Sequence, residues 1–244
     1  MSRKLINGER QLQNIAHIMD DWVANHPWAR GGWVPGDKSW DEFTSNQSNR
    51  AEILWGHEDV PQVNDDVNPI QQVREEILNL CEVLLKSNSC QTAVEIGMGN
   101  CGGSHYLWSL IFDRVFSIDV NQPLIERHIL DQKPHPDQST FICGLSHDRE
   151  IINEAGRLIK SCDFLLIDGD HLRYAVEADW RTYSHLVKPG GIIAFHDTKE
   201  DIRGHTEVAS FVKDLDKGYV TGNPIRMQYI HNSEFVGISY YVSP

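Results

Sequence analysis

The sequence is poor in basic residues and has no long apolar run. It contains 22 Lys and Arg against 35 Asp and Glu in 244 residues, a formal net charge of −13. This balance argues against sequence-independent binding to nucleic acid or to an anionic membrane surface, because both need clustered basic side chains. No stretch approaches the length of a membrane span, and the first ten residues lack the apolar run of a secretory signal. We therefore expect a soluble, cytoplasmic protein with a small-molecule partner, and its oligomeric state, a homo-oligomer included, stays open.

The cysteines do not form recognisable pairs. They are five in number, no two make a C-x-x-C motif, and three of them lie beside or inside stretches that are typical of buried strands. We interpret all five as reduced core thiols: Cys81, Cys90, Cys101, Cys143 and Cys162.

The length of the chain suits one large α/β domain with an added segment. Residues Arg10 to Ala24 place apolar side chains at helical spacing, which predicts an amphipathic helix. Residues 26 to 61 lose this periodicity, and their tryptophans are equally compatible with packing onto the main domain and with a lid that contacts substrate. A further helix begins at Asn68-Pro69. We expect residues 1–68 to form an appendage or lid and residues 69–244 to form the main domain.

Strand and helix patterns alternate through the main domain. We predict strands over 91–96, 115–120, 140–144, 163–169 and 191–197, with helices over 104–110, 124–130, 149–159 and 174–186 between them. Such alternation gives a parallel sheet with helices on both faces. After a helix near 208–215, two strand-like runs, Ile225 to His231 and Phe235 to Val242, flank the turn-forming pair Asn232-Ser233 and predict an antiparallel hairpin. The expected fold class is α/β, with a doubly wound, mostly parallel seven-stranded sheet, an antiparallel C-terminal hairpin and an N-terminal helical and irregular appendage.

A glycine-rich turn follows the first strand of this domain. Gly97, Gly99 and Gly102 allow the backbone to turn sharply and to approach a ligand. We expect Ser104 to cap the next helix, whose first amides attract an anionic group. Together with Asp119 at the end of the next strand, this spacing matches the dinucleotide fingerprint. A nicotinamide-dependent oxidoreductase is therefore one alternative.

Glu95 favours a different ligand. It lies two residues before the first glycine, where a carboxylate would repel a pyrophosphate but would suit an ammonium group. S-Adenosylmethionine carries an ammonium group and a carboxylate and has no phosphate, so we prefer it to a dinucleotide. The alternative is that Glu95 is a solvated charge at a strand end and that the glycines only form a turn.

Ligands of an open parallel sheet bind at the carboxyl ends of its strands. The residues expected there are Glu95, Asp119, Gly144 to Ser146, Asp168 to His171, and His196-Asp197. Acid and imidazole gather at the last two strand ends, where they can share a divalent cation, and oxygen-rich ligands favour Mg²⁺ or Mn²⁺ over a structural zinc. The alternative is that His196 and Asp197 only tie down the loop that follows.

From roughly Pro69 to Pro244 the sequence resembles the class I S-adenosylmethionine-dependent methyltransferases. The resemblance rests on Val-Glu-Ile-Gly-x-Gly with Gly-Gly-Ser, on Ile-Asp-Gly-Asp-His-Leu-Arg-Tyr-Ala-Val-Glu-Ala-Asp over 167–179, and on Lys-Pro-Gly-Gly-Ile-Ile-Ala-Phe-His-Asp-Thr over 188–198. The last two are similar to the cephalosporin hydroxylase-like proteins and macrolide-sugar O-methyltransferases, in which an Asp-Gly-x-His motif and a later acidic pair assemble a magnesium site.

The resemblance implies a cofactor site of nine residues. These are Glu95, Gly97 and Gly99 around the methionine part, Asp119 on the ribose hydroxyls, Leu145 with Ser146 near the adenine, and Gly102, Ser104 and Asp168 beside them. It also implies that Asp168, His196 and Asp197 hold the metal, and that His171, with Asp168, is catalytic and serves as the base. Two features depart from the subgroup: Cys101 stands near a usual glycine in a longer loop, and His196 stands where a carboxylate is common. If these side chains were only structural, Asp119 and Ser146 would cap the helices that follow them and His171 would be an ordinary helix-start residue.

The function these expectations favour is methyl transfer from S-adenosylmethionine to a hydroxyl of a small-molecule acceptor. Such a transfer gains mainly from positioning, worth up to roughly 7 to 11 kcal/mol, while a base adds roughly 10² to 10⁴-fold in rate. The oxidoreductase and a non-catalytic ligand-binding protein of the same fold are the alternatives. The sequence does not name the acceptor.

Overall fold

The computed structural model describes residues 8–25, 72–87, 89–99, 102–122, 125, 138–199, 206–232 and 236–244. Several expectations fall outside these ranges: the aromatic-rich segment 26–61, the helix start at Asn68-Pro69, Cys101, Ser233 of the hairpin turn and, apart from Ile125, the helix over 124–130. The division at residue 68 is therefore still a prediction.

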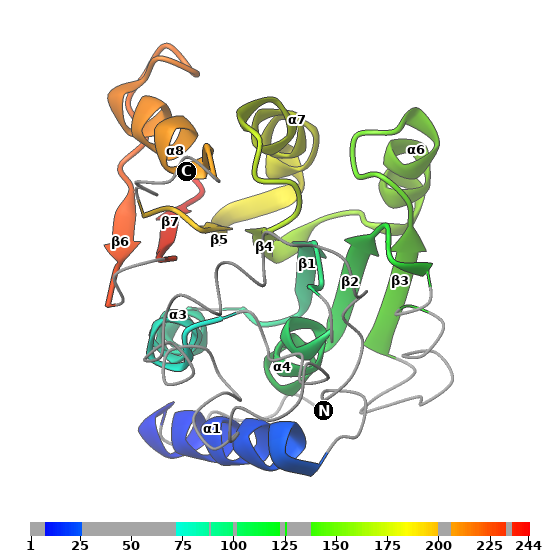
Figure 1. The fold of residues 1–244 in the computed structure, drawn as a ribbon, viewed down its shortest axis with the longest axis vertical. Coiled ribbons are helices and arrows are strands. Elements are labelled where there is room, and N and C mark those ends of the chain that lie inside the picture. Colours follow the sequence, from blue (N-terminus) through cyan, green and yellow to red (C-terminus); the bar gives the residue numbers. More distant parts are fainter. Residues whose placement is uncertain are drawn as a thin grey trace, which may run out of the picture.

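Seven strands of the described chain form one sheet in the order β3-β2-β1-β4-β5-β7-β6 (Figure 1). Their bounds are β1 Thr92–Ile96, β2 Arg114–Asp119, β3 Ser139–Cys143, β4 Cys162–Ile167, β5 Val187–His196, β6 Gln228–Ile230 and β7 Ile238–Val242. The first five strands run parallel, whereas β7 runs antiparallel to both β5 and β6. This arrangement confirms the expected fold class and adds that the last strand of the chain, β7, is inserted next to β5.

Helices cover both faces of the sheet, as the alternating pattern predicts. Their bounds are α1 Gly8–Asn25, α3 Arg74–Lys86, α4 Gly103–Ile111, α6 Arg149–Leu158, α7 Arg173–Tyr183, its 3-10 extension η2 Ser184–Leu186, and α8 Val208–Lys217. The apolar side chains of α3 and α4 pack on one face, with α1 outside them, and those of α6, α7 and α8 pack on the other face (Figure 1). No helix within the described part of the chain is both long and apolar enough to cross a membrane.

The N-terminal helix α1 is docked onto α3 and α4 rather than onto the sheet. The indole of Trp22 stacks on the ring of Tyr106 in α4, with ring centroids 5.0 Å apart. Arg74 at the start of α3 forms an ion pair with Asp20 at 2.8 Å. The amphipathic pattern of residues 10 to 24 is therefore explained by burial against a second layer of helices.

Two expectations are wrong in detail. Ser104 does not cap α4, because the helix begins one residue earlier and its N-cap is Gly102 in the left-handed conformation, with no side-chain cap bond. The Ser104 hydroxyl is instead buried without a hydrogen-bond partner among the described residues. Not every cysteine is a core thiol either: Cys81 and Cys162 are buried and free, but Cys143 is exposed at the end of β3.

Candidate functional site

The glycine turn lies where β1 and β4 end side by side, at the point where the strand order reverses. Gly97 has a φ of +87°, and a Cβ at this position would lie only 2.0 Å from the carbonyl oxygen of Asp168. The Gly97 amide donates to the carbonyl of Ile118, and the Asp168 amide donates to that of Ile96, both at 2.9 Å. Only glycine fits here, so the turn holds the ends of β1, β2 and β4 together at the usual ligand position of such sheets.

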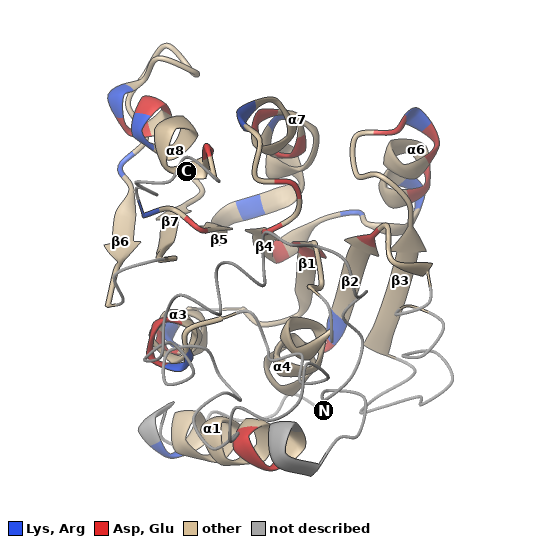
Figure 2. Ribbon diagram, in the orientation of Figure 1, with Lys and Arg blue, Asp and Glu red and all other residues tan. Residues whose placement is uncertain are grey.

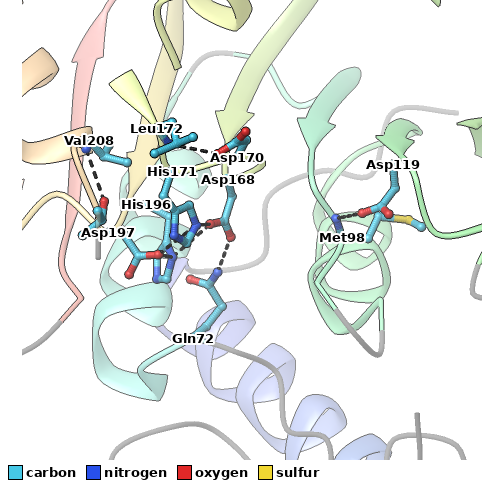
Figure 3. Close-up of polar contacts among 11 residues, drawn as sticks. Gln72, Met98, Asp119, Asp168, Asp170, His171, Leu172, His196, Asp197 and Val208 are labelled. Atoms are coloured by element: carbon cyan, nitrogen blue, oxygen red, sulfur yellow. Dashed lines mark hydrogen bonds and ion pairs between the residues drawn. The ribbon is translucent and has the colours of Figure 1, made fainter. Parts of the chain in front are cut away.

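Asp119 connects the end of β2 to this turn. Its Oδ2 accepts a hydrogen bond from the Met98 amide at 2.7 Å (Figure 3), and its Oδ1 accepts one from the Asn121 amide at 2.7 Å. The carboxylate is therefore fixed beside the glycine turn. The neighbouring Val120 and, at the end of β3, Leu145 leave 60% and 47% of their surface exposed. These apolar side chains lie at adjacent strand ends and can flank a flat ring.

Glu95 has no exposed surface. One carboxylate oxygen accepts from the Trp108 indole at 2.9 Å, and the other accepts a short hydrogen bond from the Ser117 hydroxyl. His105 extends this network, because its Nδ1 lies 2.6 Å from the Ser117 hydroxyl and its Nε2 lies 2.8 Å from the Ser139 hydroxyl. The side chain of Glu95 thus joins β1 to α4 and β2, and its geometry favours a structural role over direct contact with an ammonium group.

Acid and imidazole side chains from the ends of β4 and β5 meet beside the glycine turn (Figure 3). His171 Nε2 lies 3.1 Å from Asp197 Oδ2, and His196 Nδ1 lies 3.1 Å from Asp168 Oδ1 and 3.5 Å from Asp197 Oδ2. Gln72, next to α3, donates to the second oxygen of Asp168 at 2.8 Å. The strand-end rule therefore located these side chains correctly, and all four predicted residues are together.

Asp197 is held in an unusual backbone conformation. Among the described residues other than glycine, it alone has a positive φ, of 55°. A non-glycine residue in this region carries strain, which concentrates at functional sites. In this conformation the Asp197 carboxylate lies within 3.1 Å of His171 and 3.5 Å of His196.

Two ionisations in the cluster shift in opposite directions. Burial lowers the pKa of His196, but the carboxylates of Asp168 and Asp197 outweigh burial and hold this pKa well above its usual value. Burial raises the pKa of Asp197, but His196 and His171 outweigh it and hold this pKa below its usual value. The pairs therefore favour charged imidazole beside charged carboxylate.

The same cluster offers donors for a cation. Single ligand atoms of Asp168, His171 and Asp197 lie within 4.8 Å of one another. Two carboxylates and an imidazole are chemically suited to a divalent ion. The expected ligand set contained His196 and reserved His171 as a base, whereas this grouping includes His171, and His196 is hydrogen bonded to the same two carboxylates.

Ser146, in the loop after β3, is bonded to α7 through two groups. Its hydroxyl donates to Asp179 at 2.5 Å, and its carbonyl accepts from the Tyr183 hydroxyl at 2.6 Å. Asp179 is 1% exposed, and burial, the largest influence, raises its pKa to about 6 against the lowering effects of Ser146 and His147. The loop expected to contact adenine is therefore fixed by a buried acid.

Acidic segments gather around the carboxyl ends of β1, β2 and β4 (Figure 2). Sequence reasoning missed two polar residues that reach this region, Gln72 and Asp179. Gln72 is 96 residues from Asp168 in sequence and carries no local signal. Asp179 is the last residue of the motif over 167–179. An acidic residue on the buried face of a helix is unusual, and this was the signal that could have identified it.

Comparisons with known proteins agree with this architecture. Residues 94–198 match a family model described as a methyltransferase domain. The N-methyltransferase NodS from Bradyrhizobium japonicum WM9, in complex with S-adenosyl-L-homocysteine, is 16% identical, the match covering 85% of this chain and 100% of that one, with a TM-score of 0.53. A second NodS structure is 13% identical over 70% of this chain and 96% of its own, with a TM-score of 0.54.

A third similar structure is the MycE methyltransferase from the mycinamycin biosynthetic pathway, in complex with Mg and S-adenosylhomocysteine. It is 20% identical, the match covering 63% of this chain and 45% of that one, with a TM-score of 0.45. The comparison with curated proteins finds no match.

The antiparallel β7 between β5 and β6 separates this sheet from that of a nucleotide-binding dehydrogenase. The family match extends from β1 to the end of β5 and so includes the glycine turn, Asp119 and the acid–imidazole cluster. The nicotinamide-dependent alternative accordingly has no support. Residues 94–198 match the model of a methyltransferase domain, and the sheet and helices around them have the fold of the class I S-adenosylmethionine-dependent methyltransferases.

Proposed function

We propose that the protein transfers a methyl group from S-adenosylmethionine to a hydroxyl of a small molecule, with His171 as the proton acceptor. The observation that carries this proposal is the pairing of His171 with Asp197, Nε2 to Oδ2 at 3.1 Å, beside the glycine turn. The turn would hold the cofactor and the pair would act on the acceptor.

Several features support the cofactor position. The first turn of α4 begins at the glycine turn, so its amides attract the carboxylate of the methionine part. Ser104, in this turn, has a buried hydroxyl without a partner among the described residues and can donate to the same carboxylate. Asp119, at the end of β2, would accept from the ribose hydroxyls. Val120 and Leu145 would flank the adenine.

The chemistry we assign to His171 follows from its pairing. If Nε2 carries the proton that faces Asp197, Nδ1 is left as a free acceptor, and the carboxylate stabilises the imidazolium that forms when this nitrogen takes a proton. The side chain of His171 is 40% exposed, so an acceptor hydroxyl can approach it. In-line methyl transfer needs little beyond this proton acceptor and accurate positioning.

A divalent cation fits this cluster, whose three donors are Asp168, His171 and Asp197. The two carboxylates would hold it, and His171 would remain the proton acceptor. When bound, the cation would lower the pKa of a hydroxyl beside it. His196, paired with the same carboxylates, would orient them whether or not an ion is present. Mg²⁺ and Mn²⁺ are the ions to test first, because two of the three donors are carboxylates.

Isothermal titration calorimetry with S-adenosylhomocysteine and NAD⁺ tests the cofactor. We expect the first to bind and the second not to bind, and the opposite result would overturn the proposal. Titration with Mg²⁺ and with Mn²⁺, on wild type and Asp197→Asn, tests the metal without any need for an acceptor. Binding to wild type that is lost in the variant supports the metal site, and equal behaviour of the two proteins rejects it.

Turnover is tested with a panel of sugars, catechols and small antibiotics, by following the release of S-adenosylhomocysteine. His171→Ala should keep its affinity for S-adenosylhomocysteine and lose about 10² to 10⁴-fold in rate. His185→Ala is the matched control, because this exposed imidazole lies in η2 at the opposite end of β5. Cofactor binding without turnover on any acceptor would favour the non-catalytic alternative.

A further inference from the structure

Ser146 and Asp179 belong to a part of the site that the chemistry at His171 does not use. β2 and β3 are parallel neighbours, with Asp119 opposite Cys143 in the register, so the loop that begins at Gly144 lies beside the end of β2. A nucleoside held by its ribose at Asp119 would place its base against this loop. The exposed side chains of Val120 and Leu145 lie on the two adjacent strand ends where that base would be.

The position of Ser146 is fixed from one side. Asp179 and Tyr183 are four residues apart and so lie on the same face of α7. The Tyr183 hydroxyl fixes the backbone carbonyl of Ser146, and Asp179 Oδ1 accepts the proton of its hydroxyl. The backbone and the hydroxyl rotor are therefore both set by α7, and Ser146 itself is half-buried.

A serine hydroxyl is ambivalent, since it can donate or accept, whereas an ionised carboxylate can only accept. When Asp179 is ionised, Ser146 must donate to it, and toward a ligand it can then only accept. We propose that Asp179 fixes the Ser146 hydroxyl as an acceptor that faces the base of the cofactor, so that the site selects a 6-aminopurine over a 6-oxopurine. This inference rests on the proposed function and deepens it, because it assigns a source of cofactor specificity.

The proposal also makes selectivity dependent on pH. Protonated Asp179 can itself donate to Ser146, which releases the hydroxyl proton toward the ligand and removes the preference. Burial raises the pKa of Asp179 to about 6, so this change falls in an accessible range. The titratable groups that face Asp179 are His147 in the same loop as Ser146, Asp170 in the loop after β4, and Tyr183 on α7.

The test is calorimetric titration of the full chain with S-adenosylhomocysteine and with S-inosylhomocysteine, which differ in the amino or oxo group at position 6. At pH 7.5 the wild type should bind the amino compound about tenfold or more tightly than the oxo compound. The oxygen at position 6 of the oxo compound is an acceptor, and it would lie against the Ser146 hydroxyl, which is also restricted to accepting. Asp179→Asn should bring the two affinities to within about threefold, because an amide can present either its oxygen or its N–H groups. Ser146→Ala should do the same by removing the hydroxyl, and it does not depend on how well the Asp179 variant folds.

Asp148→Asn is the matched control, because it removes one negative charge from an exposed position in the same loop and should leave the ratio of affinities unchanged. Lowering the pH to 5.0 should shrink the ratio in wild type and not in Asp179→Asn. The inference is overturned if S-adenosylhomocysteine binds without preference over the oxo compound, if either variant keeps the wild-type ratio, or if the wild-type ratio is constant with pH. Failure of both compounds to bind the wild type would overturn the proposed function and this inference with it.

Discussion

Replacing Asp179 with asparagine should stabilise the protein at neutral pH and remove part of the pH dependence of its stability. The carboxyl is 1% exposed, and its pKa rises from the usual 3.8 to about 6. Between these two values the folded protein binds more protons than the unfolded chain, so the free energy of unfolding falls as the pH rises. The difference, 6 − 3.8 = 2.2, corresponds to about 3 kcal/mol at 1.36 kcal/mol per unit. This contribution is present below about pH 4 and is lost above about pH 6.

Urea unfolding of the wild type and Asp179→Asn at several pH values measures this effect. Other groups titrate in the same range, but the difference between the two proteins isolates Asp179, because asparagine does not ionise. From pH 4.5 to pH 7.5 the variant should gain about 2 kcal/mol relative to wild type. Asp148→Asn, which removes an exposed carboxylate from the same loop, should show no such trend. A difference between wild type and Asp179→Asn that is constant with pH would refute the argument that burial penalises this carboxylate.

Three further substitutions test the geometry of the site. Gly97→Ala would place a Cβ 2.0 Å from the Asp168 carbonyl oxygen at a φ of +87°. We therefore expect the free energy of unfolding, measured in urea, to fall by about 1 to 3 kcal/mol. An unchanged free energy of unfolding would contradict the close approach of β1 and β4. Trp108→Phe removes the indole donor to buried Glu95 and should cost about 1 to 3 kcal/mol in the same assay, whereas an unchanged midpoint would mean that this bond contributes nothing. Asp119→Ala should weaken the binding of S-adenosylhomocysteine, measured by calorimetry, by about 1.5 to 3 kcal/mol. An affinity equal to that of the wild type would show that Asp119 is not part of the cofactor site.

The fold could be predicted from the sequence because its signals are repetitive. Each parallel strand is followed by a helical pattern, and this alternation determines the layers regardless of small errors in element bounds. Details that depend on one residue were harder. Serine is a common N-cap residue, which favoured Ser104. Gly102 instead adopts the left-handed conformation at the N-cap, and the helix therefore begins at Gly103. The position of β7 beside β5 depends on packing between distant parts of the chain, so no local sequence pattern predicts it.

The location of the candidate site was predictable for a similar reason. The carboxyl ends of parallel strands lie on one edge, so residues at these ends are brought together by topology alone. The pairing within the cluster was not predictable, because either imidazole could form a hydrogen bond with either carboxylate. The structure pairs His171 with Asp197 and His196 with Asp168, and it adds Gln72 from before α3. Only the three-dimensional fold brings that glutamine to the site.

Glu95 shows most clearly where the sequence stops being informative. Its position before the glycine turn was consistent with a ligand contact and with a structural role, and the choice depends on which face of the sheet the side chain enters. In a half-exposed strand the alternation of polar and apolar residues would reveal that face, but all five residues of β1 are buried because helices cover both sides. The structure directs the Glu95 carboxylate toward α4, and Trp108 of α4 and Ser117 of β2 donate hydrogen bonds to it. Since α4 also supplies the helix N-terminus at the glycine turn, Glu95 would act on a cofactor mainly by fixing the position of this helix.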